Sequence, residues 1–522
     1  MTTHLFLFQI GPVQAFIAQA RRTQDLYVGS YTLSELARAG IAEATGQPGF
    51  EPIFPVVDER GQTQGSVPHR FAFICTGDPQ TVAAGVEAAV RTEWEQKFAD
   101  PVFRFIEEKL DGGAWQATFE RQKSSWMEFY WAAVPYTGSH SEAYKKVSAA
   151  LAQRKYARTF HQVDEPGAKC TLTGAQSALE LDWNRLRRAL YDDQGIKLRD
   201  NERLGALALI KRLVVDARRR EGIPIEDFES FPSTDEIAAG KKGGQPDRRS
   251  ADSASGRGKE VAGYLAVLHM DGDKMGKHIS ELDTIEEHQE FSRTLAEFAE
   301  KHVPEIVKEH GGETGTLVYA GGDDVLALLP LSRALRCADE LRRRFNKLTC
   351  LTASAGIAIT PANLPLDRAL ELARAAEEKA KEKYGRDALV ITEAHGTGQI
   401  REAGGKWSVL DLILALQNLF AADALSGKLG YDLRMLDHDL FGDLRAAREA
   451  EIKRIVRRRT SERAAKEQRD EIDKQRDQMI DLVEAKNIVP TWSDMANWVI
   501  LARFLAQGGT PERKQKTEEA AQ

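Results

Sequence analysis

The stretch Thr316-Leu-Val-Tyr-Ala-Gly-Gly-Asp-Asp-Val-Leu-Ala-Leu-Leu-Pro330 joins two apolar runs through a Gly-Gly-Asp-Asp turn. Short β-rich runs joined by glycines predict a β-hairpin. Gly321 and Gly322 can adopt backbone conformations closed to other residues, and they leave room for a nucleotide to approach. Asp323 and Asp324 place two carboxylates at the tip, which repel each other unless a cation lies between them. Such oxygen ligands suit Mg²⁺ or Mn²⁺ together with substrate phosphates.

A second acidic cluster, Asp271-Gly-Asp-Lys-Met-Gly-Lys277, follows the apolar run Tyr264–Met270. The run predicts a buried strand, and open α/β sheets bind ligands just past the carboxyl ends of their strands. Either cluster alone could be an acidic turn with an Asx-type cap, which is the favoured interpretation of a lone Asp-Gly-Asp. Together they are typical of the metal site of a palm-type polymerase or nucleotide cyclase, which performs two-metal phosphoryl chemistry.

The residues around both clusters, 260–400, predict one catalytic domain. Its expected elements are a strand at 262–270, a helix at 285–309, the hairpin at 315–329, a helix at 332–347, a strand at 351–359, a helix at 367–384 and a strand at 388–391. The order βαββαβ is a ferredoxin-like split unit, the core of palm domains. In that arrangement the first strand lies beside the hairpin, so we expect Asp271 and Asp323 to face each other.

The rest of the chain predicts an α+β protein with two such units, of which only the second carries the acidic turn. Residues 1–150 read as a first, inactive palm-like domain with strands near 5–10, 70–75 and 127–135. Residues 151–228 read as a mostly helical domain, 229–259 as a flexible linker or loop, and 401–522 as a C-terminal helical bundle with a disordered tail. Gln14, Arg21 and Arg22 could touch RNA or ATP, or could lie on a solvated helix face.

Composition excludes several classes of protein. The chain has 72 Lys and Arg against 79 Asp and Glu, a net charge of -7, so its whole surface is not that of a generic polyanion binder. Its four cysteines form no Cys-x-x-Cys pair, and no apolar segment resembles a signal peptide or a membrane span. We expect a cytoplasmic protein with no membrane contact.

The opening pattern Gly-Pro-Val-Gln-x-Phe-Ile-x-x-Ala-Arg-x-Thr-x-Asp-Leu-x-x-Gly-Ser of residues 11–30, the Asp-Gly-Asp-Lys-Met-Gly box and Gly-Gly-Asp-Asp occur in this order. They resemble the large subunit of type III-B (Cmr) CRISPR effector complexes, over nearly the whole chain. The resemblance implies two palm-like domains, a zinc-bearing helical domain between them and a C-terminal helical bundle. It also implies synthesis of cyclic oligoadenylate from ATP when target RNA binds, with guide RNA and the other Cmr subunits as partners.

The chain departs from the family pattern at two places. Many members begin with a His-Asp nuclease domain, whereas this sequence starts in the first palm, and His438-Asp439 is an incidental dipeptide, so we expect no DNase activity. Lys169–Gly174 and Arg203–Arg212 resemble the family's two Cys-x-x-Cys knuckles, but only Cys170 is present. The other three ligand places hold Thr173, Gly205 and Ala208. One thiolate cannot build a tetrahedral zinc site, so zinc is not expected.

The expected chemistry assigns roles to individual residues. Asp271 and Asp323 would bridge two Mg²⁺ ions, with Asp324 as a further ligand or orienting group, while an ATP 3′-hydroxyl attacks an α-phosphorus and pyrophosphate leaves. The expected nucleotide-binding residues are Gly272, Asp273, Lys274, Met275, Gly321, Gly322 and Lys381. Lys381 resembles a phosphate-binding lysine of related cyclases or pairs with Glu377 on a helix surface.

Other roles and functions stay open at the sequence level. Asp273 could bind metal or cap the following helix, and Ser354 is a weak candidate for contacting a base. The same palm could make a different nucleotide product, such as a cyclic dinucleotide, a mononucleotide or an ATP conjugate. In a second alternative the chain is a catalytically silent scaffold for guide RNA and partner subunits. The intact carboxylates argue against that scaffold.

Overall fold

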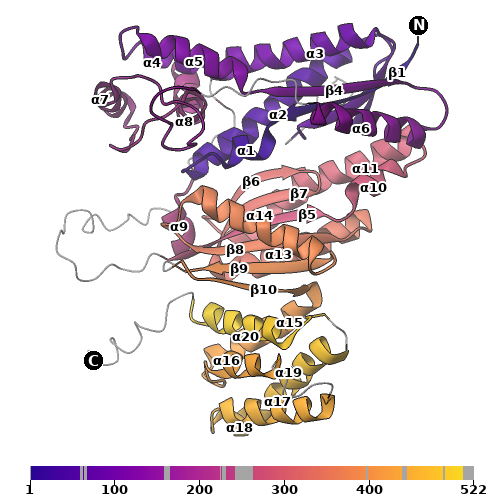
Figure 1. Cartoon of the computed structure of the whole chain (residues 1–522), viewed down its shortest axis with the longest axis vertical. Coiled ribbons are helices and arrows are strands. Elements are labelled where there is room, and N and C mark those ends of the chain that lie inside the picture. Colours follow the sequence, from indigo (N-terminus) through magenta and orange to yellow (C-terminus); the bar gives the residue numbers. More distant parts are fainter. Residues whose placement is uncertain are drawn as a thin grey trace. The chain divides into compact units, whose positions relative to one another are not determined.

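The computed structural model describes residues 2–58, 63, 67–157, 165–223, 225, 231–241, 263–395, 398–437, 444–485 and 488–508 (Figure 1). The chain divides into two compact units. The first comprises Met1–Phe231, Lys274–Lys301 and Val318–Gly322, and the second comprises Pro232–Asp273, His302–Leu317 and Asp323–Gln522. None of the described helices is both long enough and apolar enough to span a bilayer.

The first sheet belongs to the first unit and has the strand order β2-β3-β1-β4. Its strands are β1 (His4–Gly11), β2 (Glu51–Phe54), β3 (Arg70–Cys75) and β4 (Glu128–Pro135). The central strand β1 runs antiparallel to both β3 and β4. The main helices are α1 (Val13–Ala18), α2 (Thr23–Thr45), α3 (Pro79–Trp94), α4 (Asp100–Glu107), α5 (Ala114–Ser125) and α6 (His140–Tyr156).

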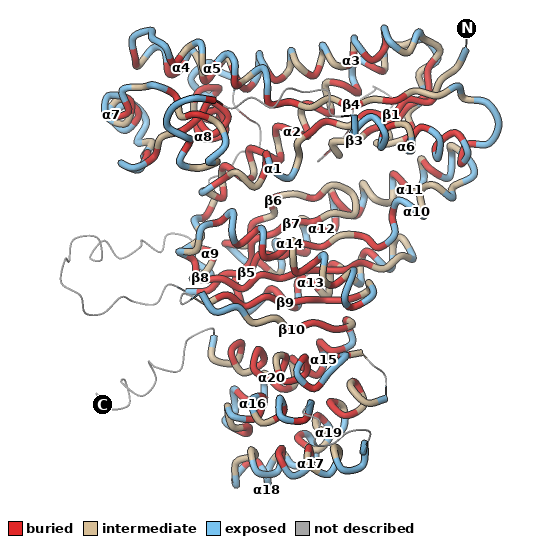
Figure 2. Tube along the Cα trace, in the orientation of Figure 1, coloured by how far each residue is buried: buried red, intermediate tan, exposed pale blue. Residues whose placement is uncertain are grey.

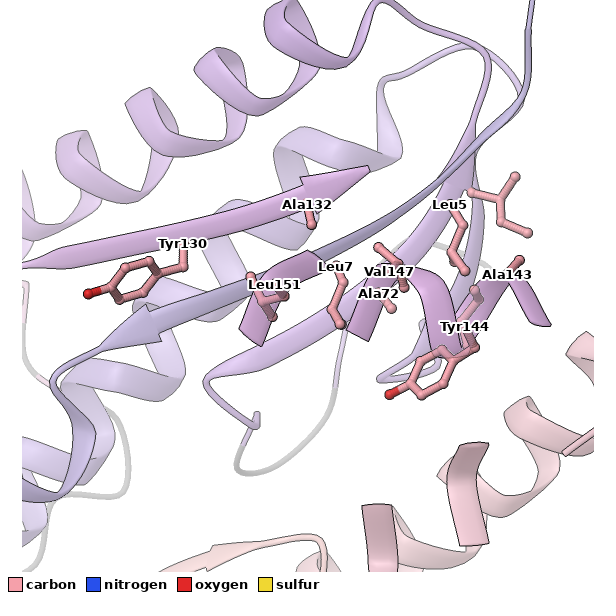
Figure 3. Packing of buried hydrophobic residues seen from close by; sticks show 11 residues of the cluster. Leu5, Leu7, Ala72, Tyr130, Ala132, Ala143, Tyr144, Val147 and Leu151 are labelled. Atoms are coloured by element: carbon pink, nitrogen blue, oxygen red, sulfur yellow. The ribbon is translucent and has the colours of Figure 1, made fainter. Parts of the chain in front are cut away.

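Both faces of β1 are buried, because successive side chains of a strand point to opposite sides of the sheet. On one face Leu5 and Leu7 pack with Tyr144 and Val147 of α6 (Figure 3). On the other face Phe6 and Phe8 stack on phenylalanines of β3 at ring centroid distances of 5.1 to 5.5 Å. The continuous apolar run at the start of the sequence is therefore explained by burial on two sides.

The second sheet has the order β10-β9-β8-β5-β7-β6. Its strands are β5 (Tyr264–Gly272), β6 (Thr316–Gly321), β7 (Asp324–Pro330), β8 (Ala353–Pro361), β9 (Ala388–Ala394) and β10 (Ile400–Lys406). Its first four strands in chain order follow the same spatial order as those of the first sheet. The prediction of an α+β fold with two βαββαβ units is confirmed. Figure 2 shows that buried residues concentrate in the central strands of the second sheet.

Helices connect these strands along the chain, close to the predicted bounds. They are α10 (Met275–Ser280), α11 (Ile285–Glu297), α12 (Val303–Gly311), α13 (Leu331–Thr349) and α14 (Leu366–Glu382), with a π-helical turn, Phe298–His302, between α11 and α12. Helix α14 packs so closely on β8 that a Cβ at Gly356 would lie 2.2 Å from the carbonyl oxygen of Ala373. This close approach fixes the helix that faces the carboxyl end of β5.

Strand β10 corrects the expectation that residues after 400 are helical. Its Ala-Gly-Gly-Lys sequence gives a weak strand signal, because glycine has no side chain to pack. Antiparallel pairing with β9 and hydrogen bonds from α20 (Trp492–Ala506) stabilise it: Trp498 Nε1 donates to the Gly404 carbonyl at 3.0 Å and Asn497 Nδ2 to the Glu402 carbonyl at 2.7 Å. Strand pairing and tertiary contacts therefore override a poor local propensity.

The C-terminal residues otherwise form helices. These are α15 (Leu410–Ala421), α16 (Leu429–Leu433), α17 (Arg445–Arg459), α18 (Ala464–Glu467), α19 (Arg469–Ile480) and α20 (Trp492–Ala506). The highly charged stretch 445–481 is broken into three helices, each with buried residues. His438, Asp439 and the tail after Gly508 lie outside the described residues.

The middle of the chain contains α7 (Trp183–Gln194), α8 (Ala206–Arg220) and α9 (Thr234–Ala239). Helix α9 corrects part of the predicted flexible linker, because Ser233 and Glu236 form a capping box at its start. Residues 242–259 of that linker lie outside the described residues. Cys170 is buried, and the second zinc-knuckle remnant forms the beginning of α8.

A buried ion pair joins the opening pattern to α8. Arg212 donates to both carboxylate oxygens of Asp25 at 2.7 to 3.1 Å and lies 3.4 Å from Glu202. Arg21 donates to the Thr171 carbonyl at 2.6 Å, and Arg22 donates to the Lys197 carbonyl. In this unit these arginines therefore bind protein carbonyl oxygens.

Removing one member of the buried pair is expected to destabilise the first unit. Asp25→Ala leaves the Arg212 guanidinium without its main counter-charge, which costs about 3 kcal/mol or more. The exposed pair Arg104–Glu221 is a control, because Glu221→Gln should cost at most about 1 kcal/mol. Thermal unfolding followed by tryptophan fluorescence compares the two variants. Equal midpoints would contradict a structural role for the buried pair.

Candidate functional site

The pairing of β5 with β7 brings the two acidic segments together. Met270 on β5 is opposite Val325 on β7 in the last registered pair of the ladder. Asp271 and Asp324 are the next residues along their strands, and Asp323 lies in the two-residue turn between β6 and β7. Gly322, in the same turn, has φ +83°, a backbone conformation that side-chain-bearing residues rarely adopt. Local turn chemistry and strand register thus converge on three carboxylates.

These carboxylates perturb one another. Burial, followed by the negative charges of Asp271 and Asp324, raises the pKa of Asp323 well above its usual range. Burial and the charge of Asp271 raise the pKa of Asp324 to about 7. The Asp324 side chain is still 31% exposed, and its Oδ1 has no hydrogen-bond partner within the described chain. Burial and mutual repulsion therefore disfavour the ionised forms of Asp323 and Asp324 in the metal-free site.

Lys381 supplies part of the missing positive charge. It lies on α14, where its Nζ forms ion pairs with Asp271 Oδ2 and, at 2.7 Å, with Glu377 Oε1. Despite burial, the nearby Asp271 and Glu377 raise the pKa of Lys381. The sequence left two alternatives for Lys381, an i,i+4 pair with Glu377 or a position at the acidic site. The structure has both.

Arg374 and His269 are two basic residues that the sequence reasoning missed. Arg374 lies on α14 seven residues before Lys381, and the charge of Asp324 partly offsets the lowering of its pKa by burial. His269 Nε2 is 3.4 Å from Asp324 Oδ1, and its Nδ1 is 3.9 Å from Glu377 Oε2. Burial lowers the pKa of His269 to about 4, so the imidazole is neutral at neutral pH.

A simple signal could have found His269. It precedes Asp271 by two positions in a strand, and residues two apart in a strand lie on the same face. The surrounding apolar run concealed it, since a histidine in such a run reads as part of the core.

Asp273 has a different environment from Asp271. Its carboxylate accepts hydrogen bonds from Thr352 Oγ1 and Ser354 Oγ at 2.8 Å and from the Asp387 backbone N–H at 2.9 Å. Asp273 is 4% exposed and Ser354 is fully buried. The cap position of α10 is Lys274, with no side-chain cap. In this structure Asp273 therefore joins the end of β5 to β8 and to the loop after α14.

The neighbouring backbone bears on the predicted phosphate contacts. The Asp273 N–H donates to the Thr352 carbonyl at 2.8 Å, so it is already engaged. Lys274 has φ +57°, and Met275 is buried at the start of α10. Gly272 pairs with Ala353 at the end of the β5–β8 ladder. Gly272 therefore ends the β5–β8 ladder next to Asp271, and the Asp273 N–H is not free to bind a phosphate in the described conformation.

The arrangement of the donor side chains bears on metal binding. Within the described ranges, no group of three or more His, Cys, Asp and Glu side chains is arranged to hold a metal ion as it stands. Lys381 instead neutralises Asp271. The chemistry of the three aspartates nevertheless fits a hard divalent cation, because carboxylate oxygens are its preferred ligands and Asp324 Oδ1 accepts no hydrogen bond within the described chain.

Comparisons with known proteins agree with this architecture. Residues 264–390 match the family described as Cas10/Cmr2, second palm domain, and residues 5–99 match CRISPR-associated protein Cmr2, N-terminal. A Cmr subunit Cmr2 from Pyrococcus furiosus is 37% identical over 24% of this chain and 18% of its own length. Cas10/Csm1 of subtype III-A from Mycobacterium tuberculosis, described as a single-strand-specific deoxyribonuclease, is 27% identical over 26% and 19%. The match thus spans less than a fifth of either relative.

Solved structures share the fold at low sequence identity. A type III-B Cmr-beta complex bound to cognate target RNA contains a chain with TM-score 0.68 and 14% identity, covering 98% of this chain and 83% of that one. A Csm1–Csm4 cassette in complex with cA4 gives TM-score 0.51 and 14% identity, covering 96% and 70%. The strand order and the paired acidic segments agree with these matches: residues 264–390 are similar to the second palm domain of Cas10/Cmr2, and residues 5–99 are similar to the N-terminal part of Cmr2.

Proposed function

We propose that the second palm of this chain joins ATP molecules into cyclic oligoadenylate. The observation that carries the proposal is the pairing of β5 with β7, which sets Asp271 beside Asp324 with Asp323 in the adjoining turn. In each step an ATP 3′-oxygen forms a bond to the α-phosphorus of the next nucleotide, the hydroxyl proton is released and pyrophosphate leaves. Fold neighbours whose descriptions name ATP and cA4 support a nucleotide substrate.

Asp271, Asp323 and Asp324 would hold two divalent cations, Mg²⁺ or Mn²⁺. Bound cations would stabilise negative charge on the attacking oxygen and on the triphosphate. Carboxylates bind such ions only when deprotonated. Burial and crowding raise the pKa values of Asp323 and Asp324, which opposes their deprotonation in the metal-free protein.

Basic side chains from α14 would bind the triphosphate. Lys381 would leave its ion pair with Asp271 and bind a phosphate oxygen, while the ion pair with Glu377 would hold the Lys381 ammonium at the site. Arg374 is placed one helical turn before Glu377, near Asp324. His269 is neutral and buried, and its Nε2, next to Asp324 Oδ1, would orient the Asp324 carboxylate. Gly322 would leave space for the nucleotide, whereas the side chain of Tyr319 already lies against the backbone of Gly321 in the described conformation. Gly272, Lys274 and Met275 would line the approach of the nucleotide.

We further propose that the chain works as the large subunit of a type III-B CRISPR effector complex. Its partners would be the other Cmr subunits, guide RNA and target RNA, and target RNA would activate the palm. The similar fold of a Cmr-beta chain solved with cognate target RNA supports this assignment.

Product analysis tests the proposed reaction. The chain is incubated with ATP and Mg²⁺, alone and assembled with guide RNA, partner subunits and target RNA, and products are identified by mass spectrometry. We expect cyclic oligoadenylate only from the target-activated intact complex and none with Asp323→Ala/Asp324→Ala. A different nucleotide product would replace the proposed reaction. Absence of any product from a correctly assembled complex would favour a scaffold.

Lys381→Ala is expected to weaken use of ATP. Loss of one charged contact to the triphosphate should lower kcat/KM by about a hundredfold. Lys383, the residue that caps the C-terminus of α14, is the control, because it pairs with Asp494 in the C-terminal bundle and its side chain is 57% exposed. Lys383→Ala should leave kcat/KM nearly unchanged. Equal loss in both variants would argue against a specific role for Lys381.

The pH dependence of stability tests the crowded carboxylates. A folded-state pKa of about 7 for Asp324 lies above its usual value of 3.8, so the metal-free folded protein binds more protons than the unfolded chain. This contribution to stability is therefore lost as pH rises from about 4 to 7. In EDTA, the thermal unfolding midpoint should fall less between pH 4 and pH 7 for Asp324→Asn than for the intact chain.

Two controls accompany this titration. Asp367→Asn changes an exposed aspartate at the start of α14 and should leave the pH profile unaltered. Added Mg²⁺ should reduce the decline in the intact protein, since a cation stabilises the deprotonated carboxylates. Identical pH profiles for the intact chain and Asp324→Asn would contradict the electrostatic description of the site.

A further inference from the structure

A polar pocket lies in the second compact unit, at the start of α13. Its volume is about 350 Å³. Side chains from α13, α15 and the ends of α12 and α20 line it, and the polar ones are His310, Ser332, Arg333, Arg336, Gln417 and Asn418. Four leucines complete the lining, namely Leu331, Leu335, Leu414 and Leu505. We call this the α13 pocket.

The α13 pocket carries unbalanced positive charge. Arg333 and Arg336 lie one helical turn apart and are exposed. Neither makes an ion pair or a hydrogen bond with another residue in the described part of the chain, and no carboxylate is among the lining residues. Further along α13, by contrast, Arg342 and Arg343 both pair with Asp339. The two arginines at the pocket are thus available to an anion.

The backbone adds to this charge. Helix α13 is 19 residues long, and its cap position is Pro330, which makes no side-chain cap. The N–H groups of the first turn therefore lack a side-chain acceptor, and the helix dipole places partial positive charge there. Leu331, Ser332 and Arg333 belong to that turn and line the pocket. An anion in the pocket would be attracted by both guanidinium groups and the helix end.

The remaining lining indicates more than a bare phosphate. Leucine side chains offer an apolar surface on which a planar ring can lie, and the amides of Gln417 and Asn418 offer donors and acceptors to a base edge. A group that combines a phosphate with a planar polar ring is a nucleotide. The volume suits one nucleotide unit, whether free or part of an RNA strand.

The α13 pocket is distinct from the acidic site. Strand β7 begins at Asp324 and ends at Pro330, immediately before α13. Its seven residues span about 20 Å of extended chain. The two sites therefore lie at opposite ends of the same strand, and the same nucleotide cannot occupy both.

We propose that the α13 pocket binds the phosphate and base of one nucleotide unit, independently of the catalytic carboxylates. Arg333 and Arg336 hold the phosphate, and the leucines and amides hold the base. This assignment does not depend on the reaction proposed for the acidic site.

Binding measurements on the full chain test the proposal. The Asp323→Ala/Asp324→Ala variant in EDTA removes metal-dependent binding at the acidic site. Calorimetry then measures binding of ATP, of a 5′-phosphorylated trinucleotide RNA and of inorganic pyrophosphate. Arg333→Gln and Arg336→Gln are each expected to weaken nucleotide binding about tenfold. Hydrogen exchange of the amides in residues 331–336 should slow on binding, which locates the ligand.

A charge-matched control uses two exposed arginines elsewhere, Arg293→Gln and Arg457→Gln. These changes should leave nucleotide binding unaltered. Tighter binding of ATP would identify a free nucleotide as the source, and tighter binding of RNA would identify a strand. Equal losses in the control and pocket variants, pyrophosphate binding as tight as that of the nucleotides, or unchanged exchange at residues 331–336 would each overturn the proposal.

Discussion

The antiparallel pairing of β5 with β7 is the constraint on which the candidate site depends. It places Asp271 and Asp324 at adjacent strand ends although 53 positions (324 − 271) separate them in the sequence. A shift of one residue would send one carboxylate to the opposite face of the sheet. The buried apolar side chains of both strands prevent such a shift, so the hydrophobic core fixes the geometry of the acidic site.

The acidic site is built as a balance of charge. Three carboxylates come from the same end of the neighbouring strands β5 and β7, and Lys381, Arg374 and Glu377 come from a single face of α14. Close packing at Gly356 sets the distance between helix and sheet. The site therefore has few ways to relieve repulsion between its aspartates. It can protonate them, it can keep Lys381 on Asp271, or it can bind a cation.

Sequence patterns predicted the parts of this arrangement that are local. Apolar runs and the Gly-Gly-Asp-Asp turn gave the strands and the carboxylates, and helical spacing gave the pair of Glu377 with Lys381. Long-range partners left no such trace: Asp25 and Arg212 are 187 positions apart, so no spacing rule connects them. Strand β10 was missed because its stability comes from β9 and α20. His269 was missed because its apolar neighbours suggested a core position.

Divalent cation binding by the three aspartates tests the central claim most directly. Free Mn²⁺ is measured by electron paramagnetic resonance while it is titrated into the full chain with a non-hydrolysable ATP analogue. We expect the intact chain to bind about two ions that Asp323→Ala/Asp324→Ala does not bind. Equal Mn²⁺ binding by the intact chain and the variant would contradict it.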